Sequence, residues 1–177
     1  MKKTMVIICF FITFIITYFL QANFFSWFTI AGIKPNLFII LILCISLFAG
    51  IKVGIGYGLF YGIFLDVVLG KSIGIYTISL TLVAILGGYL DKNFSKDSRL
   101  TIMLMVIAST LIFEVASYIL NIIILNINVE ILNFIKILVI EIIYNSIITI
   151  IIYPGVQVIG YKIEDIFKGQ KILTRYF

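Results

Sequence analysis

Long apolar stretches follow one another along the whole chain and are separated by short polar ones. A bilayer's hydrocarbon core is about 30 Å thick, so each spanning helix needs roughly 20 apolar residues. Within lipid every backbone N–H and C=O must be paired inside the protein, which leaves only helices or closed barrels. The apolar runs at residues 37–49 and 100–113 are free of charge and lack the period-two alternation of barrel strands. The pattern therefore predicts an all-α polytopic membrane protein.

The charged positions divide the chain into six predicted transmembrane helices. We expect them at residues 4–20, 35–50, 53–69, 74–90, 100–125 and 131–153. The first apolar run is longer than that of a typical signal peptide, so we expect it to be retained. The six helices use almost all of the 177 residues, and residues 1–177 are expected to form a single integral membrane domain without a separate soluble domain.

Three local features refine these boundaries. Residues 23–34 carry several aromatic rings, which favour the headgroup level, so this stretch is expected to lie along the membrane interface. Pro35 suits the first turn of a helix, where its missing N–H costs nothing. Pro154 and Gly155 are expected to bend or end the sixth helix. Residues 156–170 mix apolar and charged side chains, which is typical of a helix on the membrane surface.

The basic residues predict the orientation of the helices. The chain has a net charge of +5 and mean hydropathy of +1.24. With the N-terminus inside, the cytoplasmic side carries Lys2, Lys3, Lys52, Lys92, Lys96, Arg99, Lys162, Lys168, Lys171 and Arg175. The outer side carries Lys34 and Lys71, with Lys136 near the outer end of the sixth helix. This asymmetry predicts that both termini are cytoplasmic, and it does not indicate nucleic-acid binding.

The third predicted helix carries small residues at every fourth position. Residues four apart are neighbours on one face of a helix, so the glycines form a smooth groove that another helix can approach closely. The groove serves either tight internal packing or the docking of a partner's helix. The residues at this spacing are Gly50, Gly54, Gly58, Gly62, Asp66 and Gly70.

Three carboxyl groups fall within the predicted spans. Asp66, Glu114 and Glu141 would each be costly in lipid unless they are protonated, paired or hydrated, so each is a candidate functional residue. The alternative is a structural role, in which a protonated acid forms a hydrogen bond between helices.

Asp66 lies next to a predicted turn at the outer side of the membrane. Gly70 and Gly74 allow the chain to fold back there, and we expect the turn to shape an outward-facing polar pocket or contact surface. Asp66 either pairs with Lys71 or forms a hydrogen bond with a neighbouring helix, the expected donor being Tyr118 or Asn121.

The sequence offers little that is typical of an enzyme. It contains no histidine, no metal-ligand spacing and no phosphate-binding loop, so we expect no catalytic residues, no metal and no cofactor. A membrane aspartyl hydrolase that uses two of the three acids is the alternative.

Several motifs stand out in the first half of the chain. They are Lys-Pro-Asn-Leu-Phe-Ile-Ile at 34–40, Gly-Ile-Lys-Val-Gly at 50–54, the glycines of 58–62, Phe-Leu-Asp-Val-Val-Leu-Gly at 64–70, and the Gly-Ile-Tyr-Thr segment at 74–82. Together they resemble the MreD family of bacterial rod shape-determining proteins. Length, number of spans and topology also agree with that family. The chain departs from it at Asn36, where an acidic residue is common.

The resemblance implies a non-enzymatic scaffold of the cell-elongation complex in the bacterial cytoplasmic membrane, which supports cell shape and peptidoglycan synthesis. The implied partners are MreC and, indirectly, MreB, RodA and its partner transpeptidase, together with membrane lipid. The residues expected to form a partner surface or pocket are Asp66, Gly58, Gly62, Gly70, Gly74, Pro35, Glu114 and Glu141.

The family is also said to share a fold with the substrate-binding subunits of energy-coupling-factor vitamin transporters. Such a subunit is therefore the alternative function. Against it, residues 6–20 are bulky almost throughout and lack the paired alanines with which those subunits contact their transporter partner.

Overall fold

The computed structural model describes residues 2–69, 74–125 and 130–169. This part of the chain is helical apart from its connections and one isolated bridge between Ile30 and Ile33. The elements are α1 (Lys2–Phe19), the π-helical turn η1 (Leu20–Phe24), α2 (Phe25–Trp27), α3 (Leu37–Ala49), α4 (Ile51–Leu69), α5 (Ile75–Asn93), α6 (Arg99–Leu125) and α7 (Ile131–Lys168). The all-α prediction is confirmed.

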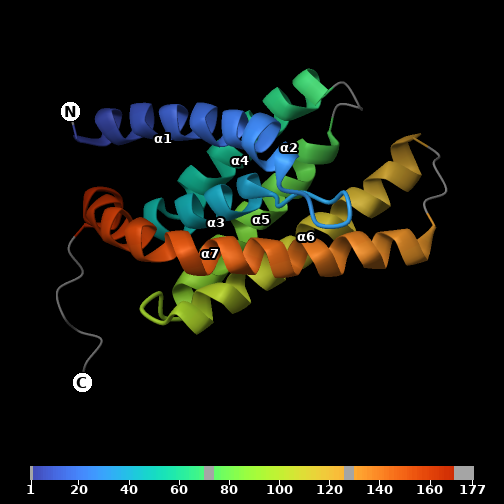
Figure 1. Ribbon diagram of the computed structural model, residues 1–177. Helices are drawn as coiled ribbons and strands as arrows, with labels where there is room; N and C mark the ends of the chain where they lie inside the picture. Colours follow the sequence, from blue (N-terminus) through green and yellow to red (C-terminus); the bar gives the residue numbers. More distant parts are fainter. Residues whose placement is uncertain (1, 70–73, 126–129, 170–177) are drawn as a thin grey trace.

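Five helical segments of the described chain are long and apolar enough to cross a membrane, which confirms a multi-pass membrane protein. They are Lys3–Trp27, α4, α5, α6 and α7. The sixth apolar helix, α3, has 13 residues and is about 20 Å long at 1.5 Å per residue. Nearly all its residues are buried, because α1, α4, α5, α6 and α7 all contact it. Figure 1 shows α3 in the middle of the bundle.

The first helix is longer than predicted. It continues past residue 20 through η1 and ends at Trp27, so the predicted interfacial segment begins as helix. The polar residues of this region do not end the helix, because their side chains find partners. Asn23 donates to the carbonyl of Phe19 at 3.1 Å, and Gln21 Oε1 accepts the backbone N–H of Leu37 at 2.8 Å.

The prediction of a separate surface helix after Pro154 is wrong. Helix α7 runs without interruption through Pro154 to Lys168, as Figure 1 shows. A proline inside a helix removes one backbone hydrogen bond, and side-chain contacts on either side hold α7 in place. Tyr153 donates its hydroxyl to the carbonyl of Lys96 at 2.6 Å, and Lys168 donates to the carbonyl of Leu47 at 2.6 Å.

Close contacts between α3, α4 and α5 form the centre of the fold. The hydroxyl of Ser46 on α3 donates to the carbonyl of Ala84 on α5 at 2.5 Å. Glycines face Ser46 from the other two helices, since a Cβ at Gly54 or Gly87 would lie 2.7 or 2.9 Å from its side chain. Small residues let helix backbones approach closely, which replaces the hydrophobic driving force that is missing between helices in lipid.

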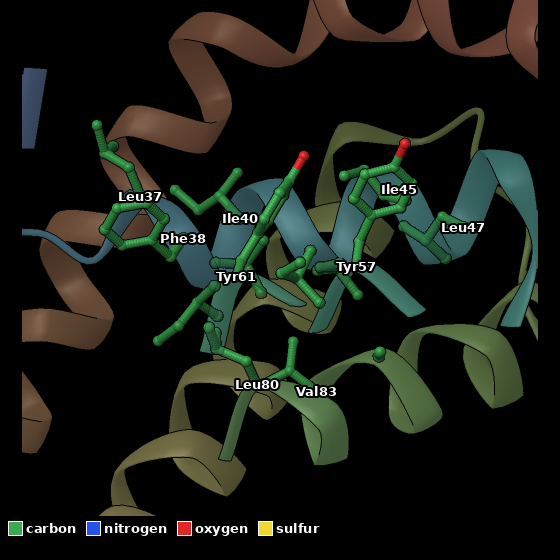
Figure 2. Packing of buried hydrophobic residues seen from close by; sticks show 14 of the residues in the cluster. Leu37, Phe38, Ile40, Ile45, Leu47, Tyr57, Tyr61, Leu80 and Val83 are labelled. Atoms are coloured by element: carbon green, nitrogen blue, oxygen red, sulfur yellow. The ribbon is translucent and has the colours of Figure 1, made fainter. Parts of the chain in front are cut away.

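Helix α1 packs less tightly than the other helices. In the segment Lys3–Trp27, which contains most of α1, only 11% of the most apolar stretch of 18 residues is buried. Its contact with α4 is aromatic: Phe14 stacks on Tyr61 with ring centres 3.9 Å apart. The hydroxyls of Tyr57 and Tyr61 donate to the carbonyls of Ile7 and Phe10 at 3.2 and 2.8 Å. In Figure 2 these hydroxyls point away from Leu80 and Val83 of α5.

The start of α1 and the end of α7 lie at the same end of the bundle (Figure 1). The rings of Phe10 and Phe167 stack with centres 6.5 Å apart, and the Lys3 ammonium lies 5.9 Å from the centre of the Phe167 ring. The position of both termini relative to the membrane stays a prediction.

Candidate functional site

Asp66, near the end of α4, caps the N-terminus of α5. Its Oδ2 accepts the backbone N–H groups of Gly74 at 2.8 Å and Thr77 at 3.1 Å, and the hydroxyl of Thr77 at 2.6 Å. Its Oδ1 accepts the N–H of Tyr76 at 2.8 Å. Asp66 is only 2% exposed. The first N–H groups of a helix have no partner within the helix and carry positive partial charge, so a carboxylate is favoured there.

This geometry corrects one prediction about Asp66. The neighbouring helix that it bonds is α5, whereas Tyr118 and Asn121 of α6 were the expected donors. Lys71, its other predicted partner, lies outside the described residues. The four bonds give Asp66 a clear positioning role, because they join α4 to α5 across the turn between them.

The glycine face of α4 is filled from inside the fold. A Cβ at Gly58 would lie 3.0 Å from the carbonyl oxygen of Leu80, and one at Gly62 would lie 2.3 Å from the Cα of Thr77. The face therefore packs against α5, so of its two interpretations the structure favours tight internal packing. Gly74 precedes α5 with a φ of +117°, a conformation that L side chains rarely adopt, and Gly70 lies outside the described residues.

The other two predicted acids meet at the contact between α6 and α7. The carboxyl groups of Glu114 and Glu141 are close enough to interact, and that of Glu141 also interacts with the side chains of Asn145 and Asn36. Glu141 is 6% exposed, and its Oε1 has no hydrogen-bond partner among the described residues. Glu114 is half-buried. The meeting of the two acids, one on α6 and one on α7, agrees with the structural alternative, in which they contribute to the contact between these helices.

A chain of amides extends this pair to the start of α3. Asn145, which is fully buried, accepts the backbone N–H of Asn36 at 2.8 Å and donates to the hydroxyl of Thr110 at 3.1 Å. Pro35 is buried beside it but precedes the helix, because α3 begins at Leu37 with Asn36 as its N-cap. Pro35 therefore does not occupy the first turn as predicted.

Tyr76 connects the two groups of acids. Its backbone N–H is bonded to Asp66, and its side chain lies within electrostatic range of Glu114, Glu141 and Asp66. The structure thus brings all three predicted acids to one region, at the level where α3 begins and α4 ends.

A second polar site, which the sequence did not predict, lies at the opposite end of α3. The ammonium of Lys96 binds Asp91 at 2.7 Å and both carboxylate oxygens of Glu164 at 2.8 and 2.9 Å. The ammonium of Lys168 binds Asp91 at 2.6 Å and Glu164 at 3.2 Å. Both ammonium groups also donate to the carbonyl of Leu47, near the end of α3. We call Asp91, Lys96, Glu164 and Lys168 the ionic cluster.

The ionic cluster is partly buried and self-compensated. Lys96 is 7% exposed and Glu164, the most exposed member, 24%. Its two positive and two negative charges balance, and positive charge is favoured at the C-terminal end of a helix. The connection between α5 and α6 is also tied to α7, because Tyr161 donates to Asp97 and Tyr153 donates to the carbonyl of Lys96. Hydrogen bonds from Tyr161 and Ser95 lower the pKa of Asp97, which lies in this connection.

One sequence signal could have indicated the ionic cluster. Glu164 and Lys168 are four residues apart, the spacing of an ion pair on one helix face. Lys96 carried no such signal, because positive charges in loops are normally explained by membrane orientation. Within the described chain, no group of three or more His, Cys, Asp or Glu residues is placed to hold a metal ion.

The comparisons with known proteins address the family. The family model of the rod shape-determining protein MreD matches residues 1–161 of the chain. No match was found among curated proteins or among solved structures. These findings give no support to the alternative of a vitamin-transporter subunit. The model covers nearly the full length of the chain, and the chain therefore belongs to the MreD family, a family of rod shape-determining membrane proteins.

Proposed function

We propose that this protein is a non-enzymatic scaffold of the bacterial cell-elongation complex, located in the cytoplasmic membrane with both termini in the cytoplasm. It binds MreC and, through MreC, is linked to MreB, RodA and the partner transpeptidase. The observation that carries the proposal is the match to the MreD family over residues 1–161.

The state of the polar groups supports a structural role. Asp66 is fully engaged in capping α5, and the ionic cluster is compensated within the fold. Both groups use their charged atoms for contacts within the described fold, as a structural role requires. Because the face of Gly58 and Gly62 is occupied by α5, we place the contact with MreC on another part of the surface.

The central experiment is co-purification of MreC with the tagged full-length chain from the membranes of its native cell, combined with depletion. We expect MreC to be recovered with the protein, and rod-shaped cells to become round on depletion. Normal rods after depletion, or a well-expressed protein that never recovers MreC, would contradict the proposal.

A second experiment separates the scaffold from an enzyme. The double change Glu114→Gln and Glu141→Gln preserves shape and hydrogen-bonding capacity but removes both acids. Asp66 is left unchanged because it caps α5. A scaffold carrying both changes should still maintain rod shape and bind MreC. Loss of rod shape by a variant with normal folding and normal MreC binding would indicate acid chemistry.

The orientation is tested by labelling single cysteines after the two native cysteines, Cys9 and Cys44, have been replaced. Reagents that do not cross the membrane should reach cysteines at residues 23 and 128 from outside. Cysteines at residue 92, an exposed position in the last turn of α5, and at residue 175 should react only after the membrane is opened. Outside labelling at residue 175 would overturn the proposed orientation.

A further inference from the structure

An apolar groove runs along α3 between α1 and α7. Its walls come from all three helices, and its volume is about 460 Å³. It extends along α3 from Leu37 to Phe48, a length of about 16 Å at 1.5 Å per residue. This is close to the depth of one membrane leaflet, about half of a 30 Å hydrocarbon core.

The groove has an open side and offers few polar groups. Cys9 on α1 and Ile159 on α7 both line it and are exposed, so the groove opens between these two helices. The hydroxyl of Thr13, one of the few polar atoms on its wall, is bonded within its own helix to the carbonyl of Cys9 at 2.8 Å. The remaining walls are almost entirely aliphatic and aromatic, so the groove favours hydrocarbon over water.

The shape of the groove suits one extended hydrocarbon chain. Such a chain is much narrower than a helix, which is about 10–12 Å across with its side chains. The groove is open on one side, and its apolar wall continues along α3 from Leu37 to Phe48, so the chain can lie parallel to α3.

A positive charge is linked to one end of the groove through a pair of stacked aromatic rings. Phe10 lines the groove and stacks on Phe167, and the ammonium of Lys3 lies 5.9 Å from the centre of the Phe167 ring. Lys3 is exposed at the end of the bundle where α1 begins. An ammonium at this position would attract an anionic headgroup whose acyl chain lies in the groove.

We propose that the groove between α1, α3 and α7 binds one acyl chain of an anionic phospholipid, with its phosphate near Lys3. The lipid fills the space that the loose packing of α1 leaves open, and it joins α1 to the rest of the bundle.

The test uses phosphatidylglycerol with a photoreactive diazirine on one acyl chain, incorporated into nanodiscs with the purified full-length protein. Crosslinks should concentrate on residues 9–17 of α1 and 152–163 of α7. Val156, which lines the groove, is changed to Trp so that the side chain fills the space. Because overfilling an apolar site is costly, we expect Val156→Trp to lower this labelling about tenfold or more.

A matched control lies two residues further along α7. Val158 is 61% exposed and does not line the groove, so Val158→Trp should label as the unchanged protein does. Thr13→Phe fills the groove from the exposed wall of α1, which keeps the test valid if Val156→Trp does not fold. Equal labelling of the groove-filling and control variants, or crosslinks spread evenly over all exposed helices, would overturn the proposal.

The headgroup is tested separately. Replacing the phosphatidylglycerol probe with the corresponding phosphatidylcholine should lower labelling of the groove in the unchanged protein, and Lys3→Gln should abolish that difference. Equal labelling by both lipids in the unchanged protein would overturn the assignment of an anionic headgroup.

Discussion

The polar sites at the levels of the two ends of α3 use opposite kinds of chemistry. At the end where α3 begins, Asp66 has no cation among its hydrogen-bond partners in the described chain, and backbone N–H groups of α5 receive its charge. At the other end, two lysines and two acids of the ionic cluster surround the carbonyl of Leu47. A helix N-terminus needs an acceptor and a helix C-terminus needs a donor. The difference teaches that one acid is sufficient where backbone amides converge, whereas buried ammonium groups need counter-ions.

The two ends also differ in redundancy. Asp66 alone accepts four hydrogen bonds, so nothing in the described chain replaces it. In the ionic cluster Lys96 and Lys168 share the same three partners, so one can compensate in part for the other. We therefore expect the Asp66 end to be more sensitive to single substitutions than the ionic cluster.

The largest effect is expected from Gly62→Leu, at the Asp66 end. A Cβ at this position would lie 2.3 Å from the Cα of Thr77, and a backbone atom cannot move without separating α4 from α5. We expect a loss of about 3 kcal/mol or more in the free energy of unfolding. Thermal unfolding in detergent measures it.

Gly56→Leu is the matched control for this change. Gly56 lies on the same helix, and a Cβ there would meet nothing within 4 Å. It should leave the melting temperature nearly unchanged. A stable Gly62→Leu protein that has lost only MreC would show that the glycine face serves a partner after all.

Asp66→Ala should follow, with a loss of about 3 kcal/mol, because it leaves three N–H groups and one hydroxyl without their acceptor. Asp66→Asn keeps one acceptor oxygen and should cost less. Protein level in the membrane and thermal unfolding are the measurements. Asp165→Ala, at an exposed position of α7, is the control. Normal stability combined with loss of MreC binding would assign Asp66 to a partner surface.

A smaller loss, about 2 kcal/mol, is expected for Lys96→Met. Removing one member of a buried ion pair is costly because its partners stay buried without compensation. Here Lys168 still binds both acids, and these are 16% and 24% exposed, which reduces the cost. Lys92→Met changes an exposed lysine of the same region and should have little effect. A loss for Lys96→Met that equals the loss for Asp66→Ala would remove the proposed difference in redundancy.

The same contrast shows which parts of the structure could be predicted from sequence. Hydropathy located every long helix, because a helix in lipid consists of apolar residues. A helix enclosed by protein is also apolar, so hydropathy could not show that α3 is a short central helix surrounded by its neighbours. It also could not show that α7 continues through Pro154, since this depends on contacts made by residues on both sides of the proline.

The candidate site was predictable in the same uneven way. An acid in an apolar run stands out, so the amino-acid sequence alone is enough to single out Asp66, Glu114 and Glu141. Their partners could not be predicted, because the N–H groups that bind Asp66 belong to the backbone, which carries no residue-specific signal. The burial of Lys96, which is only 7% exposed, could not be predicted, because lysines in loops are usually exposed.

The smallest expected effect concerns the connection beside the ionic cluster. Hydrogen bonds from Tyr161 and Ser95 lower the pKa of Asp97 below its ordinary value. A carboxyl group with a lowered folded-state pKa adds stability at neutral pH, and this contribution is lost as the pH falls below about 4. Tyr161→Phe removes the larger of the two hydrogen bonds. It should lower the melting temperature slightly at pH 7 and less at acidic pH, where Asp97 becomes protonated. Because Asp97 is exposed, water screens much of the effect.

Tyr89→Phe, on a tyrosine that is 63% exposed, is the control for this change. An equal drop for Tyr161→Phe at both pH values would assign the role of Tyr161 to packing against Phe48, whose ring lies 5.8 Å from its own.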